Sequence, residues 1–291
     1  MTEHIDNEKI MAAIEKTPLI PANTAQLVNV CNDPMHCLRD IVHVAKHDAA
    51  LTANILRVVN SAAFSRSITI DTIDRAVSLL GGDIIVGMAL AETAETFFKK
   101  DLTGYGGHQY DLWRHDLRTA IASKKIAEKS AGKINADVAF TAGLLHDLGK
   151  AILSDFLQGT MEKILAAIDS GQYADYPTAE KEIVGVDHGY IGYLMIKKWN
   201  LPESILDAVR YHHEPAAAQP ELRPLVYAVH LGDLIAMMSG GGTGADSMHC
   251  ALDPEYKKYI HLSEDDFSII LLDVEEEYNI LKSTLFDQGD S

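Results

Sequence analysis

A histidine and an aspartate stand side by side inside an apolar stretch of the chain. The segment Gly143-Leu-Leu-His-Asp-Leu-Gly-Lys150 places His146 and Asp147 where the surrounding residues predict a buried helix. Burying two such polar side chains without partners is costly in free energy, whereas a bound metal ion would ligate both of them. Any fold of this chain must satisfy this pair, and the pair indicates a metal site.

Lys150 follows the pair closely. It lies four residues after His146 and three after Asp147, so on a continuous helix the three side chains would share one face. Two interpretations remain open. The ammonium could hold an anionic substrate group against the metal, which would make Asp147 and Lys150 catalytic residues. Alternatively, it could be a solvated cation at a helix C-terminus.

Apolar residues recur at three- and four-residue spacing along most of the chain, as in residues 51–60 and 84–98. This spacing indicates amphipathic helices, and no alternating stretch is framed by hairpin turns, so an all-α fold is expected. Ser263 and the acidic residues after it predict a last helix that runs to about Phe286, before a frayed tail. The other helices expected after residue 108 cover about 109–131, 136–157, 160–170, 177–186, 189–199, 203–212 and 221–239.

Two glycine-rich segments interrupt this pattern. The first, residues 104–108, has three glycines in four positions, which disfavours a helix interior and predicts a boundary between domains at 1–103 and 104–291. A chain of 291 residues is long enough for two domains. The second segment, residues 239–245, predicts a flexible surface loop.

The composition limits the partners and the compartment. With 42 acidic against 25 basic side chains the net charge is -17, which argues against general nucleic-acid binding, because such binding depends on Lys and Arg. No apolar run approaches the roughly 18 residues of a membrane span, and the N-terminus resembles no secretory signal. We therefore expect no membrane partner and a cytoplasmic location. Cys31, Cys37 and Cys250 form no CxxC pair and are expected to be reduced packing residues.

Further imidazoles and carboxylates are distributed along the second half of the chain. Taken singly, each has a structural explanation, such as a packed histidine or a histidine at a helix end. Together they exceed what one tetrahedral ion needs. They suit two divalent ions (iron, manganese, zinc or nickel) about 3.5–4 Å apart, sharing a water that attacks phosphorus. The candidate ligands are His115, His146, Asp147, His188, His212, His213 and Asp233.

Eight other histidines show no comparable pattern. We expect them to be structural or surface residues. Trp113 and Trp199 should pack between helices rather than stack on a ligand. The eight histidines are His4, His36, His43, His47, His108, His230, His249 and His261.

Three passages of the chain resemble the HDOD domain, a branch of the HD superfamily of metal-dependent phosphohydrolases. Asp48-Ala-Ala-Leu-Thr52 followed by Leu56-Arg-Val-Val-Asn-Ser-Ala-Ala-Phe64 is similar to one family signature. Ile73-Asp-Arg-Ala-Val-Ser-Leu-Leu-Gly81 is similar to a second. Phe140-Thr-Ala-Gly-Leu-Leu-His-Asp-Leu-Gly-Lys150 looks like a third, which contains the His-Asp pair. The resemblance covers about residues 10–240.

The resemblance implies an N-terminal helical bundle packed on a C-terminal HD-like helical domain, in a bacterial signalling or regulatory module. Many members of the family have lost the metal ligands, whereas this chain has equivalents of all seven. Related dinuclear enzymes place an acid one turn before the first histidine, which makes Asp111 a weaker eighth candidate. HD-GYP phosphodiesterases of cyclic di-GMP carry a Gly-Tyr-Pro motif after the double histidine. Residues 214–224 lack it, so a retained metal site does not establish activity on that substrate.

Three functions remain open from the sequence. The first is a signalling or scaffold module that binds a protein partner or a small ligand and whose metal is structural or sensory. The second is a metal-dependent phosphohydrolase or phosphodiesterase acting on a nucleotide-like phosphoester, with Lys150 neutralising a phosphoryl oxygen. The third is di-iron oxygenase chemistry, which some HD-fold proteins perform and which no feature of this sequence favours.

Overall fold

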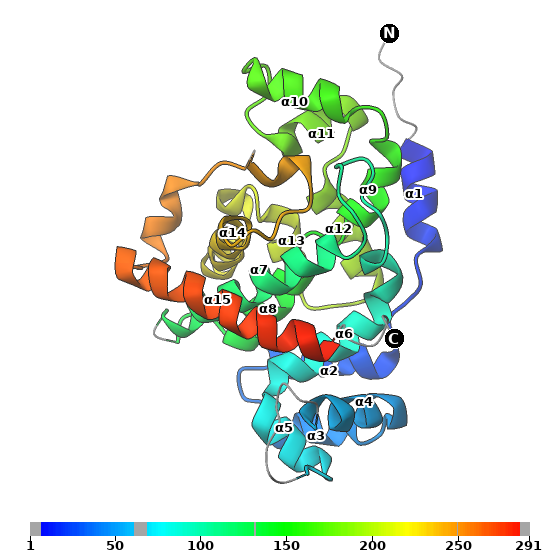
Figure 1. Cartoon of the computed structure of the whole chain (residues 1–291), viewed down its shortest axis with the longest axis vertical. Helices are drawn as coiled ribbons and strands as arrows, with labels where there is room; N and C mark the ends of the chain where they lie inside the picture. Colours follow the sequence, from blue (N-terminus) through cyan, green and yellow to red (C-terminus); the bar gives the residue numbers. More distant parts are fainter. Residues whose placement is uncertain (1–6, 61–68, 131, 249, 286–291) are drawn as a thin grey trace.

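The computed structural model describes residues 7–60, 69–130, 132–248 and 250–285, and every regular element in these ranges is helical (Figure 1). The predicted all-α fold is confirmed for this part of the chain. Ser61 to Phe64 of the first family passage, His4, His249 and the tail from Phe286 lie outside the described residues. The first helices are α1 Asn7–Lys16, α2 Ala22–Asn32, α3 Leu38–Ala45, α4 Ala49–Val59, α5 Ile73–Leu80 and α6 Gly82–Phe98.

The helices expected after residue 108 are found close to their predicted limits, with one exception. They are α7 Asp111–Glu128, α8 Ala136–Leu145, α9 Lys150–Phe156, α10 Met161–Asp169, α11 Tyr176–Val184, α12 His188–Lys198, α13 Glu203–Tyr211, α14 Arg223–Met238 and α15 Glu264–Leu285. Ser263 precedes α15 as predicted and closes a capping box with Asp266. Its Oγ accepts a hydrogen bond from Asp266 N at 3.1 Å, and its own N–H donates to Asp266 Oδ2 at 3.0 Å.

The exception is the helix expected over residues 136–157, which is broken by a turn between α8 and α9. In this turn Lys150 N donates to Asp147 O at 2.8 Å, a three-residue spacing tighter than that of an α-helix. Gly149 lies directly against α12, because a Cβ there would be 2.0 Å from His188 O. This contact with α12 favours an early end of α8, and the His-Asp pair lies in the turn rather than on a regular helix face.

The centre of the structure is a close packing of α7 against α8 and α14 (Figure 1). Two glycines make this approach feasible. A Cβ on Gly143 of α8 would lie 2.8 Å from Ala120 Cα, and one on Gly232 of α14 would lie 2.3 Å from Ser123 Oγ, both on α7. Trp113 of α7 is buried with its ring against Phe98 of α6, so it packs between helices as predicted. Because the three backbones come so near, side chains from all of them can meet in the interior.

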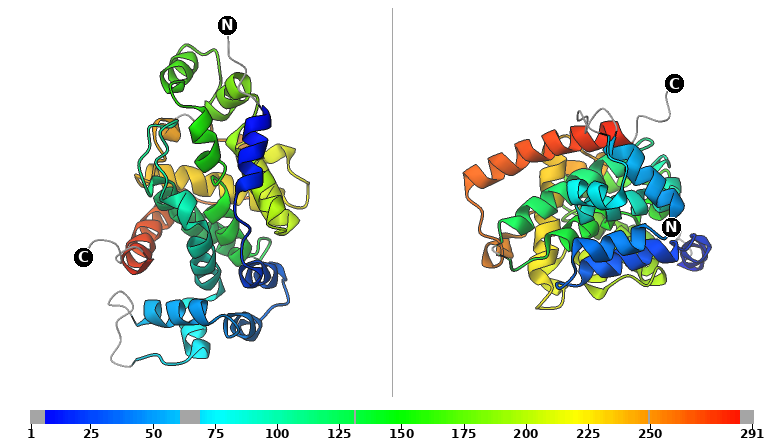
Figure 2. Two further views of the ribbon diagram at one scale, coloured as in Figure 1. Left: turned by 90° about the vertical axis from the view of Figure 1, so that its right-hand side faces the viewer. Right: turned by 90° about the horizontal axis from the view of Figure 1, so that it is seen from below.

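The N-terminal helices occupy two places in the molecule. α3, α4 and α5 lie together at one end, and α2 and α6 connect them to the rest (Figure 1 and Figure 2). α1 packs instead against α9 and α12, where Lys198 Nζ donates to Thr17 O at 2.7 Å. Trp199 Nε1 donates to Pro18 O at 2.9 Å, so this tryptophan packs between segments as predicted. The division of the chain at residues 103 and 104 stays a prediction.

The glycine-rich segment 239–245, expected to be a flexible surface loop, is packed against the other glycine-rich segment, 104–108. A Cβ on Gly107 would lie only 2.2 Å from Thr243 O, so a larger residue would not fit. The Thr243 side chain is buried. The glycines therefore serve close backbone contact here. Gly241 and Thr243 are buried whereas Gly240 is exposed, so the predicted surface position holds only in part.

The three cysteines are unpaired, but they do not share one environment. Cys31 is buried and packs as predicted. Cys37 is exposed at the start of α3, where its N–H donates to Asp40 Oδ2 at 2.8 Å. Cys250 is half-buried and lies beside His213, one of the candidate ligands. The prediction of a packing role is therefore wrong for Cys37.

Among the residues that the structure describes, no single helix is both long and apolar enough to cross a membrane. The consecutive helices α5 and α6 reach that length and composition only together, and they are bent by 103° at the break between them. The first half of α6 is buried against neighbouring helices, which accounts for its apolar composition.

We expect Gly143→Ala to destabilise the protein by about 1–3 kcal/mol, because the added methyl group would overlap the backbone of α7. At an open helical position the same change would stabilise by about 0.5–1 kcal/mol, so the sign of the effect is diagnostic. Urea-induced unfolding followed by circular dichroism measures it. A more stable variant would contradict the close packing of α7 and α8.

Candidate metal centre

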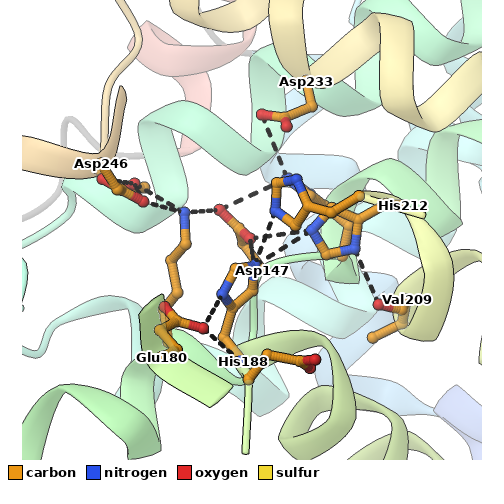
Figure 3. Close-up of polar contacts among 12 residues, drawn as sticks. Asp147, Glu180, His188, Val209, His212, Asp233 and Asp246 are labelled. Atoms are coloured by element: carbon orange, nitrogen blue, oxygen red, sulfur yellow. Dashed lines mark hydrogen bonds and ion pairs between the residues drawn. The ribbon is translucent and has the colours of Figure 1, made fainter. Parts of the chain in front are cut away.

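All seven residues predicted as metal ligands meet in one cluster inside the structure. Figure 3 labels four of them, Asp147, His188, His212 and Asp233. The seven residues come from α7, the turn after α8, the start of α12, the end of α13 and α14. Six of the side chains are at most 2% exposed, and His213 is half-buried. So many buried titratable groups require compensating charges or ligands.

The two carboxylate oxygens of Asp147 face two different groups of side chains. The group beside Oδ2, here named the first triad, consists of His115, His146 and Asp233. The group beside Oδ1, named the second triad, consists of His188, His212 and His213. One carboxylate thus connects two sets of three donors, as a ligand that bridges two ions would.

The distances within each set match the spacing of donors around one metal ion. In the first triad His115 Nε2 lies 3.0 Å from Asp233 Oδ1, and it lies 3.5 Å from Asp147 Oδ2. In the second triad His188 Nε2 lies 3.0 Å from His213 Nε2, and it lies 3.2 Å from Asp147 Oδ1. Donors about 2.1 Å from an ion lie about 3.0 Å apart in octahedral geometry and about 3.4 Å apart in tetrahedral geometry. Each set therefore has the size of one coordination shell.

Four of the five imidazoles are held by a hydrogen bond at Nδ1, the ring nitrogen that faces away from the cluster. Each acceptor is a carbonyl or carboxylate oxygen, so Nδ1 carries the proton and Nε2 is directed at the cluster. The bonds run from His115 to Gly241 O at 2.7 Å, from His146 to Gly143 O at 2.8 Å, from His188 to Glu180 Oε2 at 2.8 Å and from His212 to Val209 O at 2.9 Å.

The inward-facing atoms of the cluster need a cation between them. Asp147 Oδ2 is paired with Lys150 Nζ at 2.6 Å, whereas Asp147 Oδ1 and Asp233 Oδ1 are buried and face imidazole nitrogens, at 3.2 Å from His188 Nε2 and 3.0 Å from His115 Nε2. Burial opposes a further positive charge here, but the carboxylates of Glu180 and Asp147 raise the pKa of His188 to about 10, so without metal a protonated His188 supplements the charge of Lys150. Divalent ions would take over this role, because mixed imidazole and carboxylate donors suit metals of borderline softness. The residues present therefore fit a divalent metal.

Glu180 is a member of the site that the sequence did not indicate. It lies on α11, is fully buried, and accepts hydrogen bonds at Oε2 from both the N–H and the Nδ1 of His188, each at 2.8 Å. Its other oxygen accepts from the hydroxyl of Tyr105 at 2.6 Å. Glu180 thereby fixes the ring of His188, a role that depends on the packing of α11 and leaves no signal in the sequence.

Lys150 is fully engaged inside the site. Its Nζ lies 2.6 Å from Asp147 Oδ2 and 2.5 Å from Asp246 Oδ2, and it donates to Thr243 Oγ1 at 3.0 Å. The side chain is only 2% exposed, and α9 begins at this residue. The alternative of a solvated cation at a helix C-terminus is therefore wrong. Asp246 and Thr243, which the sequence did not single out, reach Lys150 because the loop after α14 folds inward.

Asp111, the weaker eighth candidate, lies outside the cluster, whereas Asp116 is buried at its edge, on the side of His146 Nδ1. The Asp111 carboxylate pairs with Arg114 at 3.0 Å at the start of α7. Asp116 is fully buried, with Oδ1 at 3.7 Å from His146 Nδ1, and burial together with the charge of Asp147 raises its pKa well above the usual range. The side chains of adjacent residues on a helix point about 100° apart. The position of Asp116 directly after His115 therefore did not indicate that it lies near the cluster.

His230 and Cys250 both lie near the centre, but the structure gives them different roles. His230 is structural, as predicted: its Nδ1 donates to His212 O at 2.8 Å, and its Nε2 accepts from Asp253 N at 3.0 Å. Cys250 lies with His213 and Asp233 in a group whose ligand atoms are all within 4.8 Å of one another. A thiol therefore borders the half-buried side of the cluster.

The stability of the metal-free protein should fall as the pH is lowered from 7 to about 4.5. Burial lowers the pKa of His212 to about 4, although Asp147 acts in the opposite direction. Because folding lowers the pKa of His212, its contribution to the free energy of unfolding is complete above the unfolded pKa of about 6.5. This contribution, on the order of 3 kcal/mol, is lost as the pH falls towards 4. Urea unfolding of chelator-treated protein should therefore show a steeper loss for wild type than for His212→Gln. Equal slopes would contradict this burial.

We expect Glu180→Gln to weaken divalent-metal binding by about 10–100-fold, because the amide cannot supply the charge that holds His188 Nδ1–H. Calorimetric titration of the metal-free protein with Mn²⁺ measures the affinity. Glu182→Gln, two residues away on the same helix and exposed, is the matched control and should bind like wild type. Equal affinities for the two variants would exclude the role assigned to Glu180.

Three solved structures have a similar fold. An HDOD domain protein of unknown function from Geobacter sulfurreducens is 24% identical, with a TM-score of 0.69 and 95% of both chains covered. A protein from Marinobacter aquaeolei VT8, provisionally named a signal transduction protein, is 18% identical with a TM-score of 0.73, covering 98% of this chain and 67% of the other. A protein from Shewanella amazonensis SB2B, provisionally named a phosphohydrolase, is 22% identical with a TM-score of 0.57, covering 96% and 92%.

The sequence itself matches a family model over most of its length. Residues 17–215 match the HDOD domain, which confirms the resemblance seen in the motifs. An uncharacterised protein from Treponema pallidum (strain Nichols) is 24% identical over 230 residues, or 79% of this chain. That match covers 44% of the relative, so the chain spans less than half of the relative's length. With a matching family model and the same helical fold, this chain belongs to the HDOD domain family.

Proposed function

We propose that this chain is a divalent-metal-dependent hydrolase of a small phosphoester. Its centre would be dinuclear, with one ion in the first triad, one in the second triad, and Asp147 as the bridging ligand. The position of Asp147 is the observation that supports this most, because each of its oxygens faces a different triad at 3.2–3.6 Å. Iron, manganese, zinc and nickel all suit such a donor set.

When bound, two such ions would supply Lewis-acid stabilisation of phosphoryl oxygens and a water activated near neutral pH. The chain's own contribution is to hold its donors rigidly and to exclude bulk water, since six of the seven ligands are nearly inaccessible. His213 and Cys250 are the more exposed members, so substrate would approach from their side. The net charge of -17 favours a small phosphoester or nucleotide over a nucleic-acid polymer.

Lys150 supplies the positive charge that a phosphoryl oxygen would meet beside the bridging carboxylate. In the structure this position is taken by Asp246, whose carboxylate lies 2.5 Å from Nζ. Substrate would therefore compete with Asp246 for the ammonium, and displacement of the loop that carries Asp246 and Thr243 would accompany binding. Asp147 has a second role in this arrangement, since its Oδ2 fixes Nζ at 2.6 Å.

The same contacts favour a second candidate, a signalling module whose metal is structural. Three protein groups already satisfy Lys150, and a site closed in this way needs no substrate to compensate its charge. In that case the metal would stabilise the fold, and a protein partner would bind elsewhere on the helical surface. Both candidates require the two triads to hold metal, so turnover distinguishes them.

The deciding experiment is a screen of nucleotides, cyclic dinucleotides and generic phosphoesters with Mn²⁺, Fe²⁺, Zn²⁺ or Ni²⁺, with metal content measured in parallel. We expect wild type to hold about two ions and to turn over one substrate class, and Asp147→Asn to lose both ions and turnover. Lys150→Gln should keep its metal but lose about 10²–10³ in kcat. Lys163→Gln, an exposed lysine on α10, is the control.

Two results would reject the hydrolase. Wild type that holds two ions without turnover across the whole screen would favour the structural metal of the signalling module. Turnover that survives Asp147→Asn would show that the activity arises elsewhere. Melting curves of each variant, recorded with and without metal, separate loss of chemistry from loss of fold.

A further inference from the structure

A second group of metal-ligating side chains lies away from the cluster around Asp147. It consists of Cys31 at the end of α2, His36 in the turn before α3, and Asp137 in the first turn of α8, and its ligand atoms all lie within 4.8 Å of one another. Asp137 and His146 are at opposite ends of α8, roughly 13 Å apart along the helix axis. The two groups of ligands are therefore separate.

His36 is oriented in the same way as the histidines of the metal centre, by a hydrogen bond from its Nδ1. Its Nδ1 donates to Asp33 O at 2.6 Å, so the proton is on Nδ1 and Nε2 faces Asp137. The distance from His36 Nε2 to Asp137 Oδ2 is 3.4 Å, the spacing expected for two ligands of one tetrahedral ion. The buried thiol of Cys31 lies next to this pair. A simple surface ion pair between His36 and Asp137 would need no such third group.

The surroundings of Cys31 favour a cation. The side chain is 1% exposed, and burial, followed by the charges of Asp137 and Asp83, raises the pKa of the thiol to about 12. Asp83 is paired with Lys124 at 2.7 Å, which leaves Asp137 as the carboxylate that faces the thiol and His36. Gly82 lies beside both side chains, since a Cβ there would be 3.6 Å from Cys31 Sγ and from Asp137 Oδ2, and 2.5 Å from Ile41 Cδ1.

We propose that Cys31, His36 and Asp137 form a mononuclear site for a zinc-class divalent ion. Thiolate, imidazole and carboxylate together select metals of borderline softness, and coordination would deprotonate the thiol. His36 and Asp137 are 15% and 26% exposed, so the fourth position faces solvent and takes a water. The proposal does not depend on the function of the centre around Asp147.

Such an ion would join parts of the chain that are far apart in sequence. Asn135 Nδ2 already donates to Cys31 O at 3.1 Å across 104 positions, and it caps α8 through its own Oδ1. A metal bond from the α2–α3 turn to Asp137 would strengthen the same junction, because ligands brought together only by folding stabilise the folded state when metal binds.

Cobalt(II) is a suitable probe, because it replaces zinc and a thiolate–cobalt bond gives charge-transfer absorption in the near ultraviolet. Full-length protein, freed of metal and kept reduced with a phosphine, is titrated with Co²⁺. We expect the thiolate band to appear in wild type, in Cys37→Ser and in Cys250→Ser, and to be absent in Cys31→Ser. Zn²⁺ added in one equivalent per site should abolish the band.

His36→Ala provides a second test with little risk to folding, because the residue lies in a turn outside the helices and its side chain is not fully buried. It should weaken the Co²⁺ affinity of the thiolate site by more than the roughly 10–100-fold that an outer-shell partner contributes. Unchanged affinity, or no thiolate band in wild type at saturating Co²⁺, would overturn the proposal. A band lost in Cys250→Ser instead would assign the thiolate to the group with His213 and Asp233, and would also reject it.

Discussion

The carboxylate of Asp147 is the feature on which the rest of the interior depends. It is buried, it faces a triad of donors on each side, and it is paired with Lys150. Although burial opposes it, the charge of Lys150, followed by that of His146, lowers the pKa of Asp147 well below the usual range. A charge of this kind is tolerated in a protein core only where every neighbour is placed to compensate it. The surrounding helices hold those neighbours in position around Asp147.

The packing of α7, α8 and α14 provides that placement. Gly143 and Gly232 let the three backbones approach one another, and Gly149 lets the turn after α8 rest on α12. The close approach brings imidazoles from separate helices to within coordination distance, while carbonyl oxygens near the helix ends fix their Nδ1 atoms. The loop after α14 completes the enclosure, because Thr243 and Asp246 bind Lys150 from the side opposite Asp147. In the proposed hydrolase, substrate binding at Lys150 would therefore displace this loop.

α8 connects the cluster around Asp147 with the group formed by Cys31, His36 and Asp137. Its C-terminal end leads into the turn with His146 and Asp147, and its first turn carries Asp137, which faces Cys31 and His36. The N-terminal helices therefore contact the same helix that supports the central cluster. α2 packs directly on α8, so a displacement of α2 would reach the helix that leads into the central cluster.

Much of this arrangement follows from the sequence alone. The three- and four-residue spacing of apolar side chains predicted the helices. The residue types at seven positions predicted a set of candidate metal ligands, because burying so many imidazoles and carboxylates is costly in free energy unless partners compensate them. The structure brings these seven side chains together, and their binding of metal stays a prediction. The break after α8, the inward loop, and the positions of Glu180, Asp116 and Asp246 could not be predicted. Each depends on contacts between segments distant in sequence, such as Gly149 against α12. Local patterns thus determined which residues form helices and which can ligate, and tertiary packing alone decided which atoms meet, because the distances between donors are set by how closely the helices approach.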